Sequence, residues 1–396
     1  MKHPLEIQYG PVDGWLILLI MGGLSISFFS YQVIKATRLV MLGAPDNRFD
    51  SWGLRIKEML VGWLGQKKVL RDKVAGTMHV LMFWGFLMLG SDMLDLASAN
   101  YFSEHLLPSF LNNPWNGIVE LGYTTALLGA LAALTRRIIF TPEKLKGKSQ
   151  LEGNFILVLI LTITSTSFII ESPENPSSFW EPLGFWVSGL GLSSTFIVAS
   201  YWAHMVAICC FLVLIPVSKH MHLVMAIPNV FFHDTQALGK MRPLAIGEDG
   251  KAVPLEDLDI DSFGVSTFDQ YTWRQIIDGW SCTSCARCQD VCPAYESGKG
   301  LNPMQVIHDV RNYANEYAPI LLKGENPEET MLARITSEAV WACTTCNACV
   351  DICPLYIEHV PKLTELRRNA MMETMEYPEE LNVAMGNLES ASNPYG

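Results

Sequence analysis

The sequence predicts an all-α protein in which five transmembrane helices precede a helical, cysteine-rich domain. Two observations support this fold class. The first 220 residues contain five apolar stretches, each of about 20 residues, the length that a helix needs to cross a bilayer. The remaining residues contain two cysteine runs with identical spacing. We expect a transmembrane domain at 1–235, a linker at 236–270, the helical cysteine-rich domain at 271–378 and a C-terminal tail at 379–396.

Composition is typical of a membrane protein with an acidic soluble part. Hydrophobic residues make up 49% of the 396 residues, and the mean hydropathy is +0.21. Residues 1–235 contain 16 Lys/Arg and 16 Asp/Glu, whereas residues 236–396 contain 12 and 24 and so carry the whole net charge of −12. The basic footprint of a nucleic-acid-binding protein is therefore missing. We expect the acidic part to face protein partners or simply to remain soluble.

Each apolar stretch is interpreted as a membrane-spanning helix in contact with lipid. The first stretch has the position of a signal peptide, but its flank, Met1–Gly14, contains one lysine and two acids, and no small-residue cleavage site follows. We therefore expect this span to be retained. The five predicted spans are Trp15–Lys35, Thr77–Ala97, Gly117–Phe140, Gly153–Ile170 and Thr195–Val217.

The basic residues of the connecting loops predict the orientation in the membrane. Lys35–Lys73 contains nine Lys/Arg and Arg136–Lys148 contains five, whereas Ser98–Asn116 and Glu171–Ser194 contain none. Because basic loops stay on the cytoplasmic side, we expect a multi-pass protein of the cytoplasmic membrane with its N-terminus outside. The fifth helix then delivers the cysteine-rich domain into the cytoplasm, where cysteines remain reduced.

Histidines in or near the membrane helices are candidate functional residues, because ionisable side chains are costly there. His79 lies near the cytoplasmic end of the second helix, and His222 lies at the cytoplasmic end of the fifth. Two opposing imidazoles across a helix bundle are a usual way to hold a b-type haem. We therefore expect His79 and His222 to be the axial ligands of one haem. The alternative is that these are interfacial histidines near the headgroups, which is the favoured interpretation of His220.

His204, in the outer part of the fifth helix, has three possible roles. His222 follows it by 18 residues, or about five helical turns, so both histidines are expected to project from one face of the helix. A second haem would need a partner on the second helix, where Leu89 and Gly90 stand and only Met93 offers a sulfur. Alternatively, His204 exchanges a proton at a quinone site or makes a plain buried polar contact.

The cysteine runs carry the clearest chemical signal. They are Cys282-x-x-Cys285-x-x-Cys288-x-x-x-Cys292-Pro293 and Cys343-x-x-Cys346-x-x-Cys349-x-x-x-Cys353-Pro354. This spacing is typical of two [4Fe–4S] clusters, in which the fourth cysteine of each run binds the cluster of the other run. Disulfides and structural zinc also use paired cysteines, but the duplication ending in Cys-Pro disfavours both. The expected ligand sets are Cys282, Cys285, Cys288 and Cys353 for one cluster, and Cys343, Cys346, Cys349 and Cys292 for the other.

The rest of the soluble part is predicted to be helical. The stretch before the first cysteine run contains prolines and acids and is interpreted as a linker along the membrane surface. Between the runs, Asn302-Pro303 opens a helix at Met304–Glu316, and a second helix is expected at Glu328–Ala342. A further helix is expected at Lys362–Met375. Together these predict an α-helical ferredoxin domain that holds two clusters. No Walker A loop, dinucleotide fingerprint or nucleophile elbow is visible.

The fifth membrane helix resembles a known family. Tyr201-Trp-Ala-His204 through Ile215-Pro216-Val-Ser-Lys219-His-Met-His222 is similar to the haem-binding last helix of the gamma subunit, a cytochrome b, of respiratory nitrate reductases. That family has five membrane helices, exchanges electrons with quinones and usually binds two haems. The resemblance implies a cytochrome b bundle here. The outer ligand on the second helix is not histidine in this chain, so only the cytoplasmic haem carries over.

The soluble part resembles a second family. Trp273 to Cys282, Gly298-Lys-Gly-Leu-Asn-Pro303, and Trp341-Ala-Cys343-Thr-Thr-Cys346 are similar to the cluster module of membrane-bound iron–sulfur oxidoreductases related to heterodisulfide reductase. In that family, a nitrate-reductase-gamma-like domain precedes this module, and cysteine-rich CCG domains follow it. The CCG portion is absent from this chain, so the resemblance implies that a separate subunit supplies it or that the protein works without it.

These observations predict a membrane electron-transfer subunit of a quinone-linked oxidoreductase, active within a complex. Electrons are expected to pass between (mena)quinone, haem b, the two [4Fe–4S] clusters and a soluble or membrane-associated redox partner, for which a subunit carrying CCG domains is one candidate. The alternative is a non-catalytic wiring or anchor subunit whose quinone and substrate sites lie in partner subunits. A transporter is disfavoured, because only five spans and no inverted repeat are present.

Overall fold

The computed structural model describes residues 3–102, 112–140, 148–172, 176–244, 253–254 and 263–396, except for the side chains of 91–102, 112 and 148–149. It is mostly helical and divides into two compact units. The membrane unit comprises Met1–Val33 and Val69–His220, and the cysteine unit comprises Ile34–Lys68 and Met221–Gly396. This division differs from the domain boundary expected at residue 235, because the segment 34–68 folds with the cysteines.

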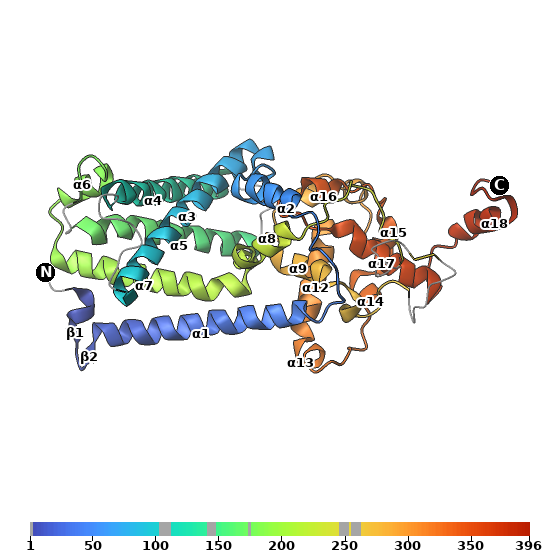
Figure 1. Ribbon diagram of the computed structural model, residues 1–396, viewed down its shortest axis with the longest axis horizontal. Helices are drawn as coiled ribbons and strands as arrows, with labels where there is room; N and C mark the ends of the chain where they lie inside the picture. Colours follow the sequence, from blue (N-terminus) through green and yellow to red (C-terminus); the bar gives the residue numbers. More distant parts are fainter. Residues whose placement is uncertain (1–2, 103–111, 141–147, 173–175, 245–252, 255–262) are drawn as a thin grey trace. The chain divides into compact units, whose positions relative to one another are not determined.

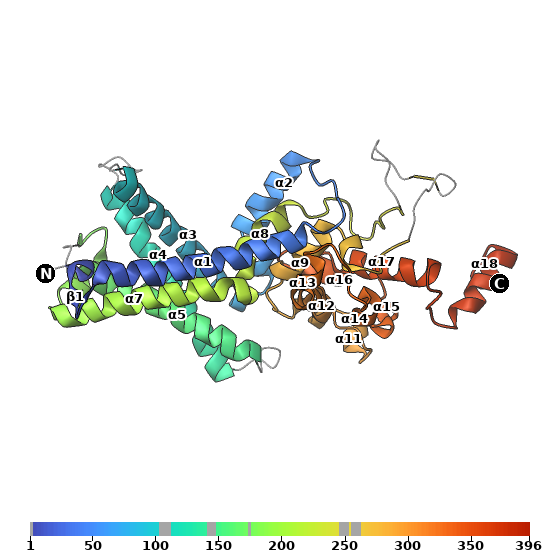
Figure 2. The same ribbon diagram turned by 90° about the horizontal axis from the view of Figure 1, so that it is seen from below.

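The membrane unit consists of long helices preceded by a short hairpin (Figures 1 and 2). The hairpin packs on the last long helix, where the Tyr9 hydroxyl lies 2.6 Å from the indole nitrogen of Trp202. The elements that begin in this unit are η1 (Pro4–Glu6), β1 (Gln8–Tyr9), β2 (Val12–Asp13), α1 (Gly14–Val40), η3 (Val69–Arg71), α3 (Lys73–Phe102), α4 (Asn112–Thr135), η5 (Arg136–Phe140), α5 (Lys148–Glu171), α6 (Pro182–Ser188), α7 (Ser194–Leu214), η8 (Ile215–Val217) and η9 (Lys219–Met221).

Five helical segments of the described residues are long and apolar enough to cross a membrane, which agrees with the five predicted spans. They are Gly14–Val40, Lys73–Gly90, Asn113–Phe140, Gln150–Glu171 and Ser194–Val217. Small residues let α3 and α4 approach closely, as is typical of membrane helices. A Cβ atom on Gly85 of α3 would stand only 2.7 Å from the carbonyl oxygen of Gly122 on α4. In sequence order, α3 packs on α4, α4 on α5, and α5 on α7.

The helix that contains His204 does not continue to His222. α7 ends at Leu214, and two 3₁₀ turns follow before a new helix begins at His222. Pro216 explains the break, because proline lacks the N–H of the helical ladder and its ring clashes with the preceding turn. Ser218 is fully extended, with φ −116° and ψ −179°. The expectation that His204 and His222 share one helix face is therefore wrong.

The regular elements of the cysteine unit are helices within its described residues, as the sequence predicts. The expected helix at Glu328–Ala342 is instead two short helices separated at Thr336, which has a φ of +76°. The elements are α2 (Trp52–Glu58), η2 (Met59–Leu64), α8 (His222–Phe231), η11 (Phe268–Gln270), α9 (Trp273–Ser281), α10 (Arg287–Asp290), α11 (Pro293–Glu296), α12 (Pro303–Glu316), α13 (Ala318–Leu321), α14 (Met331–Ile335), α15 (Ser337–Ala342), α16 (Ala348–Ile352), α17 (His359–Met372) and α18 (Leu381–Ala391).

A buried ionic network fastens α9 to α17. The carboxylate of Asp278 accepts hydrogen bonds from Arg274 Nη1 at 2.8 Å, from Lys362 Nζ and from the backbone N–H of Glu358 at 3.0 Å. Arg274, Asp278 and Lys362 are all fully buried. The paired cations stabilise the Asp278 carboxylate and lower its pKa to about 2, although burial alone opposes this shift.

The segment 34–68 joins the same network. Arg48 lies 3.0 Å from the Glu358 carboxylate, and Arg55 donates to the backbone carbonyl groups of Phe231 and His233 at 3.0 and 2.8 Å. Both arginines are buried. The segment 34–68, which follows most of α1, is therefore an integral part of the cysteine unit.

Candidate metal centre

The two cysteine runs fold into loops with the same backbone conformation. In the first loop Ser284 and Ala286 have positive φ angles of 55° and 62°, and in the second loop the corresponding residues, Thr345 and Asn347, have 55° and 61°. Such angles are uncommon for residues other than glycine and cluster at functional sites. Alternation of this kind turns backbone N–H groups into a concavity that binds anions, including iron–sulfur clusters.

The helices around the loops fix their ends. Thr272 and Gln275 form a capping box that starts α9, and Cys282 follows the end of this helix in an extended conformation. Cys343 follows α15 in nearly the same conformation, with ψ 124° compared with 125° at Cys282. The short helices that contain the third cysteine of each run, α10 and α16, pack against each other. The two loops are therefore brought face to face within one unit.

The electrostatic neighbours of the thiols identify which cysteines lie together. Burial raises the pKa of the Cys288 thiol, and Cys353, Cys282, Cys285 and Cys349 add to this increase, in that order. Burial, together with the neighbouring thiols of Cys343, Cys292, Cys346 and Cys353, raises the pKa of Cys349 to about 12. The structure thus brings the fourth cysteine of each run next to the other run. We call Cys282, Cys285, Cys288 and Cys353 the first set, and Cys343, Cys346, Cys349 and Cys292 the second set.

The donors of both sets fit iron–sulfur clusters. Buried neutral thiols resist ionisation, as the raised pKa values of Cys282 (about 11) and Cys353 (about 12) indicate, so thiolates here require a bound cationic centre. Within the described residues, no three His, Cys, Asp or Glu side chains lie close enough to hold a single metal ion. Ligands of a four-iron cluster each bind a different iron and stand further apart, so this spacing is compatible with such clusters.

Polar side chains approach each set from the surrounding helices. His308, on α12, lies with Nε2 3.7 Å from Cys282 Sγ and 3.0 Å from Ser284 Oγ. Asn302 caps α12 by accepting hydrogen bonds from Met304 and Gln305, as the Asn-Pro pair predicted. On the other side, Arg367 donates to the backbone carbonyl group of Cys343 and lowers the pKa of that thiol, although burial raises it overall. Hydrogen bonds and charges of this kind set cluster potentials.

The first set lies next to α8. Ser281, which precedes Cys282, donates a hydrogen bond to the backbone carbonyl group of Met225 at 3.2 Å. Met225 is on α8, three residues after His222, the predicted haem ligand. Arg287, between the second and third cysteines of the first run, donates to the carbonyl group of Lys68 at 3.0 Å. Residues next to the first set therefore contact α8 and the segment 34–68 within the cysteine unit.

The predicted histidines are placed as follows. His79 lies on α3 of the membrane unit, and His222 begins α8 of the cysteine unit. His204 lies on α7, with Nδ1 2.9 Å from Thr166 Oγ1 and 3.1 Å from the carbonyl oxygen of Ile163 on α5. The side chain of Met93, the alternative haem partner, lies outside the described residues.

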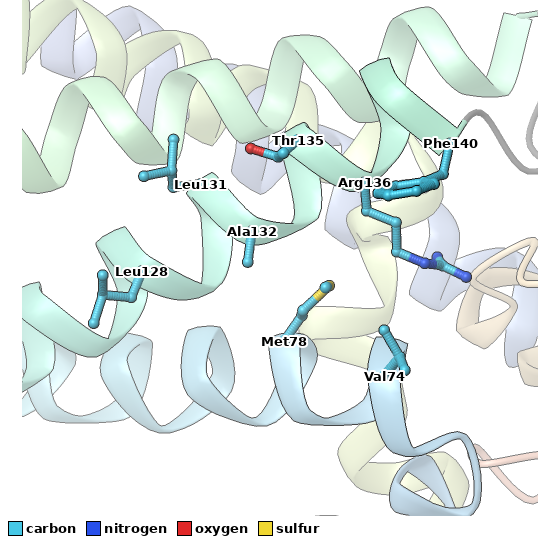
Figure 3. A pocket seen from close by; sticks show the side chains of 8 residues that line it. All are labelled: Val74, Met78, Leu128, Leu131, Ala132, Thr135, Arg136 and Phe140. Carbon is cyan, nitrogen blue, oxygen red and sulfur yellow. The ribbon is translucent and has the colours of Figure 1, made fainter.

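An apolar groove of about 610 Å³ opens on the surface of the membrane unit between α3 and the end of α4 (Figure 3). Its lining includes Val74 and Met78 from α3, Leu128 and Leu131 from α4, and Arg136 from η5. Leu128 and Leu131 are 54% and 52% exposed, on a surface that lipid would cover. Met78 directly precedes His79.

Glu120 is a buried membrane residue that the sequence reasoning missed. It lies on α4, and its carboxylate accepts hydrogen bonds from the backbone N–H groups of Leu183 and Gly184, each at 2.9 Å. These N–H groups begin α6, and an acid at a helix N-terminus is stabilising. A lone acid within a predicted apolar span is the signal that could have identified it.

Comparison with known proteins supports the iron–sulfur interpretation. Residues 274–354 match the model of a 4Fe-4S dicluster domain. The chain is 30% identical to the EtfAB:quinone oxidoreductase of Syntrophomonas wolfei, over all of this chain and 61% of that protein. It is 27% identical to the probable iron-sulfur-binding oxidoreductase FadF of Bacillus subtilis, over 96% of this chain and 59% of that protein.

A smaller relative aligns with the cysteine-rich part. This protein, one of the subunits of the ferredoxin:CoB-CoM heterodisulfide reductase of Methanosarcina mazei, is 31% identical over 110 residues, 27% of this chain and 56% of that protein. No solved structure matches the chain. The chain spans about three fifths of the length of the first two relatives. The matching domain and these relatives together show that the chain is an iron–sulfur electron-transfer protein related to quinone oxidoreductases and heterodisulfide reductase subunits.

Proposed function

We propose that this chain is the membrane electron-transfer part of a quinone-linked oxidoreductase. One observation carries the proposal: the fourth thiol of each cysteine run neighbours the other run, in a chain that also has five helices suited to a membrane. Haem b and two [4Fe–4S] clusters, when bound, would supply one-electron chemistry. The chain would hold these groups at fixed positions and tune them through His308, Arg367 and the backbone N–H groups of both loops.

The proposed order of the electron path follows from contacts within the cysteine unit. His79 and His222 are the proposed axial ligands of the haem, near the cytoplasmic side of the membrane. His222 begins α8, and Ser281 binds α8 through Met225. The first set is therefore proposed to exchange electrons with the haem, and the second set with a partner protein. The N-terminus is proposed to lie outside and the cysteine unit in the cytoplasm.

The groove between α3 and α4 is the proposed entrance for quinone. Its apolar lining suits a ring with an isoprenoid chain, and its lipid-facing opening admits a ligand dissolved in the bilayer. Arg136 would donate a hydrogen bond to a quinone carbonyl oxygen at the end of the groove. His204 is the second candidate, because its Nδ1 is held by Thr166 and Ile163 within the bundle.

The relatives suggest the partner. One is named EtfAB:quinone oxidoreductase and another belongs to a heterodisulfide reductase, so we propose that this chain exchanges electrons with an EtfAB-like or a CCG-bearing protein. The alternative function is a wiring or anchor subunit whose quinone and substrate sites both belong to partners.

The test uses the full chain in lipid nanodiscs. We expect about eight iron and eight sulfide per chain, from two four-iron clusters, and visible haem b bands that the His222→Ala variant loses while it keeps its iron and sulfide. A menaquinol analogue should reduce the haem. Arg136→Met should slow this reduction if the groove binds quinone, and His204→Phe should slow it if the bundle site does, with Arg38→Met as the matched control. Haem that does not respond to the analogue would favour the wiring subunit, and zinc in place of iron would refute the proposal.

A further inference from the structure

The two cysteine sets differ in their exposure. Three cysteines of the first set are buried and one is half-buried, whereas the second set has one buried, two half-buried and one exposed cysteine, Cys346. Ser281, which precedes the first set, also contacts α8 through its hydrogen bond to Met225. A redox centre held by the second set would therefore lie nearer the surface of the cysteine unit.

An open pocket of about 620 Å³ lies beside the second set. Its lining includes Trp341 and Ala342, which directly precede Cys343, and the aromatic ring of Tyr377 after α17. Met375, two residues before Tyr377, is 72% exposed. Exposed methionine and aromatic side chains are enriched where proteins contact one another. The pocket therefore combines access to the second set with side chains suited to a protein interface.

The surface around this pocket is acidic. Glu338 and Glu376 line the pocket together with one base, Lys299. The segment 373–380 contains four exposed glutamates and no lysine or arginine. Within the described part of the chain, Glu376, Glu379 and Glu380 form no ion pair. We call Glu338, Trp341, Glu376, Tyr377, Glu379 and Glu380 the acidic face.

We propose that the acidic face docks a separate redox protein that presents a basic contact surface. This inference rests on the proposed function and adds the site and the charge of the partner. One electron would pass between the centre held by the second set and the partner's own centre, so that one is oxidised as the other is reduced, with no bond formed or broken. Charge complementarity selects this occupant, because a second copy of the chain, with its net charge of −12, and an anionic lipid surface would both be repelled.

The test compares two variants that each lose two exposed negative charges. Glu376→Gln/Glu379→Gln alters the acidic face, whereas Glu325→Gln/Glu328→Gln alters the exposed loop after α13. Full-length protein in nanodiscs is reduced with dithionite and mixed rapidly with a basic c-type cytochrome as the probe. We expect the face variant to reduce the cytochrome about fivefold more slowly at low salt, and the control variant to match the wild type. The difference should shrink as salt screens the charges.

Two further measurements make the outcome decisive. Iron and sulfide content should be the same in both variants, and a small neutral quinone should reoxidise the clusters of both at the wild-type rate. If both variants reduce the cytochrome at the wild-type rate, the proposal that the acidic face docks the partner is refuted. If both are slowed equally, only the general effect of net charge is shown, and the proposal is refuted as well. A wild-type preparation without iron and sulfide would instead refute the proposed function, on which the docking site depends.

Discussion

Asp278 is the residue whose loss should destabilise the cysteine unit most. Its carboxylate is the common acceptor for Arg274, Lys362 and the backbone of Glu358, and all three of the charged side chains involved are fully buried. Asp278→Asn keeps the shape but leaves the buried Lys362 without its counter-ion and Arg274 with only Glu358, 3.5 Å away. Removing one partner of a buried ion pair costs about 3–5 kcal/mol. In a domain of about 200 residues, this corresponds to a fall of about 10 °C in the melting temperature.

The assay follows the visible absorbance of the clusters in the full-length protein during heating at a fixed rate, because loss of a cluster is irreversible. The double variant Asp278→Asn/Lys362→Met should recover part of the loss, since it also removes one uncompensated cation. Glu325→Gln, an exposed substitution, is the control and should melt with the wild type. A melting temperature of Asp278→Asn within about 2 °C of the wild type would refute the network as a source of stability.

Three further predictions concern the cysteine sets and their surroundings. His308→Phe removes the imidazole that contacts Cys282. Because a hydrogen bond favours the more negative reduced cluster, we expect one of the two midpoint potentials to fall by about 40 mV, the equivalent of about 1 kcal/mol. A redox titration followed by paramagnetic resonance, in which neither potential moves, would contradict this. Burial lowers the pKa of His359 to about 4, so the unfolded chain binds the proton first as pH falls below about 6.5. The free energy of unfolding should therefore decrease by up to about 3 kcal/mol between pH 6.5 and 4. His359→Gln should weaken this dependence, and an unchanged pH profile in that variant would count against the role of His359. If the fourth cysteine of each run binds the cluster of the other run, Cys292→Ser/Cys343→Ser should keep about half of the iron, because both residues serve one cluster. Cys292→Ser/Cys282→Ser should instead damage both clusters. The reverse pattern in metal analysis would show that each run binds its own cluster.

Local patterns in the sequence were sufficient to predict the helices and the kind of metal centre. The apolar stretches predicted five helices that are long and apolar enough to span a membrane, because crossing a bilayer imposes a length and a composition on each segment separately. The cysteine spacing predicted a dicluster domain, because the ligands of a cluster come from a short loop whose geometry is local. The helix at α12 followed from Asn302-Pro303 for the same reason, since a cap depends only on its nearest neighbours.

The features that sequence reasoning missed depend on contacts between distant residues or on a single backbone angle. Arg48 and Glu358 are 310 positions apart, so nothing local indicates that the loop after α1 belongs with the cysteines. The break after Leu214 follows from Pro216 and was overlooked because the apolar pattern continues across it. The left-handed residue Thr336 divides a segment whose composition is suitable for one helix.

The role of Arg48 and Arg55 has a consequence for biogenesis and for laboratory fragments. The segment that contains these arginines leaves the ribosome early, whereas Glu358, the partner of Arg48, emerges 310 residues later. The ion pair between Arg48 and Glu358 can therefore form only after 310 further residues have been synthesised. A recombinant fragment that starts after the last membrane helix would lack the segment 34–68 and its contacts with the cysteine unit. Supplying residues 34–68 in the same polypeptide is the direct way to restore these contacts.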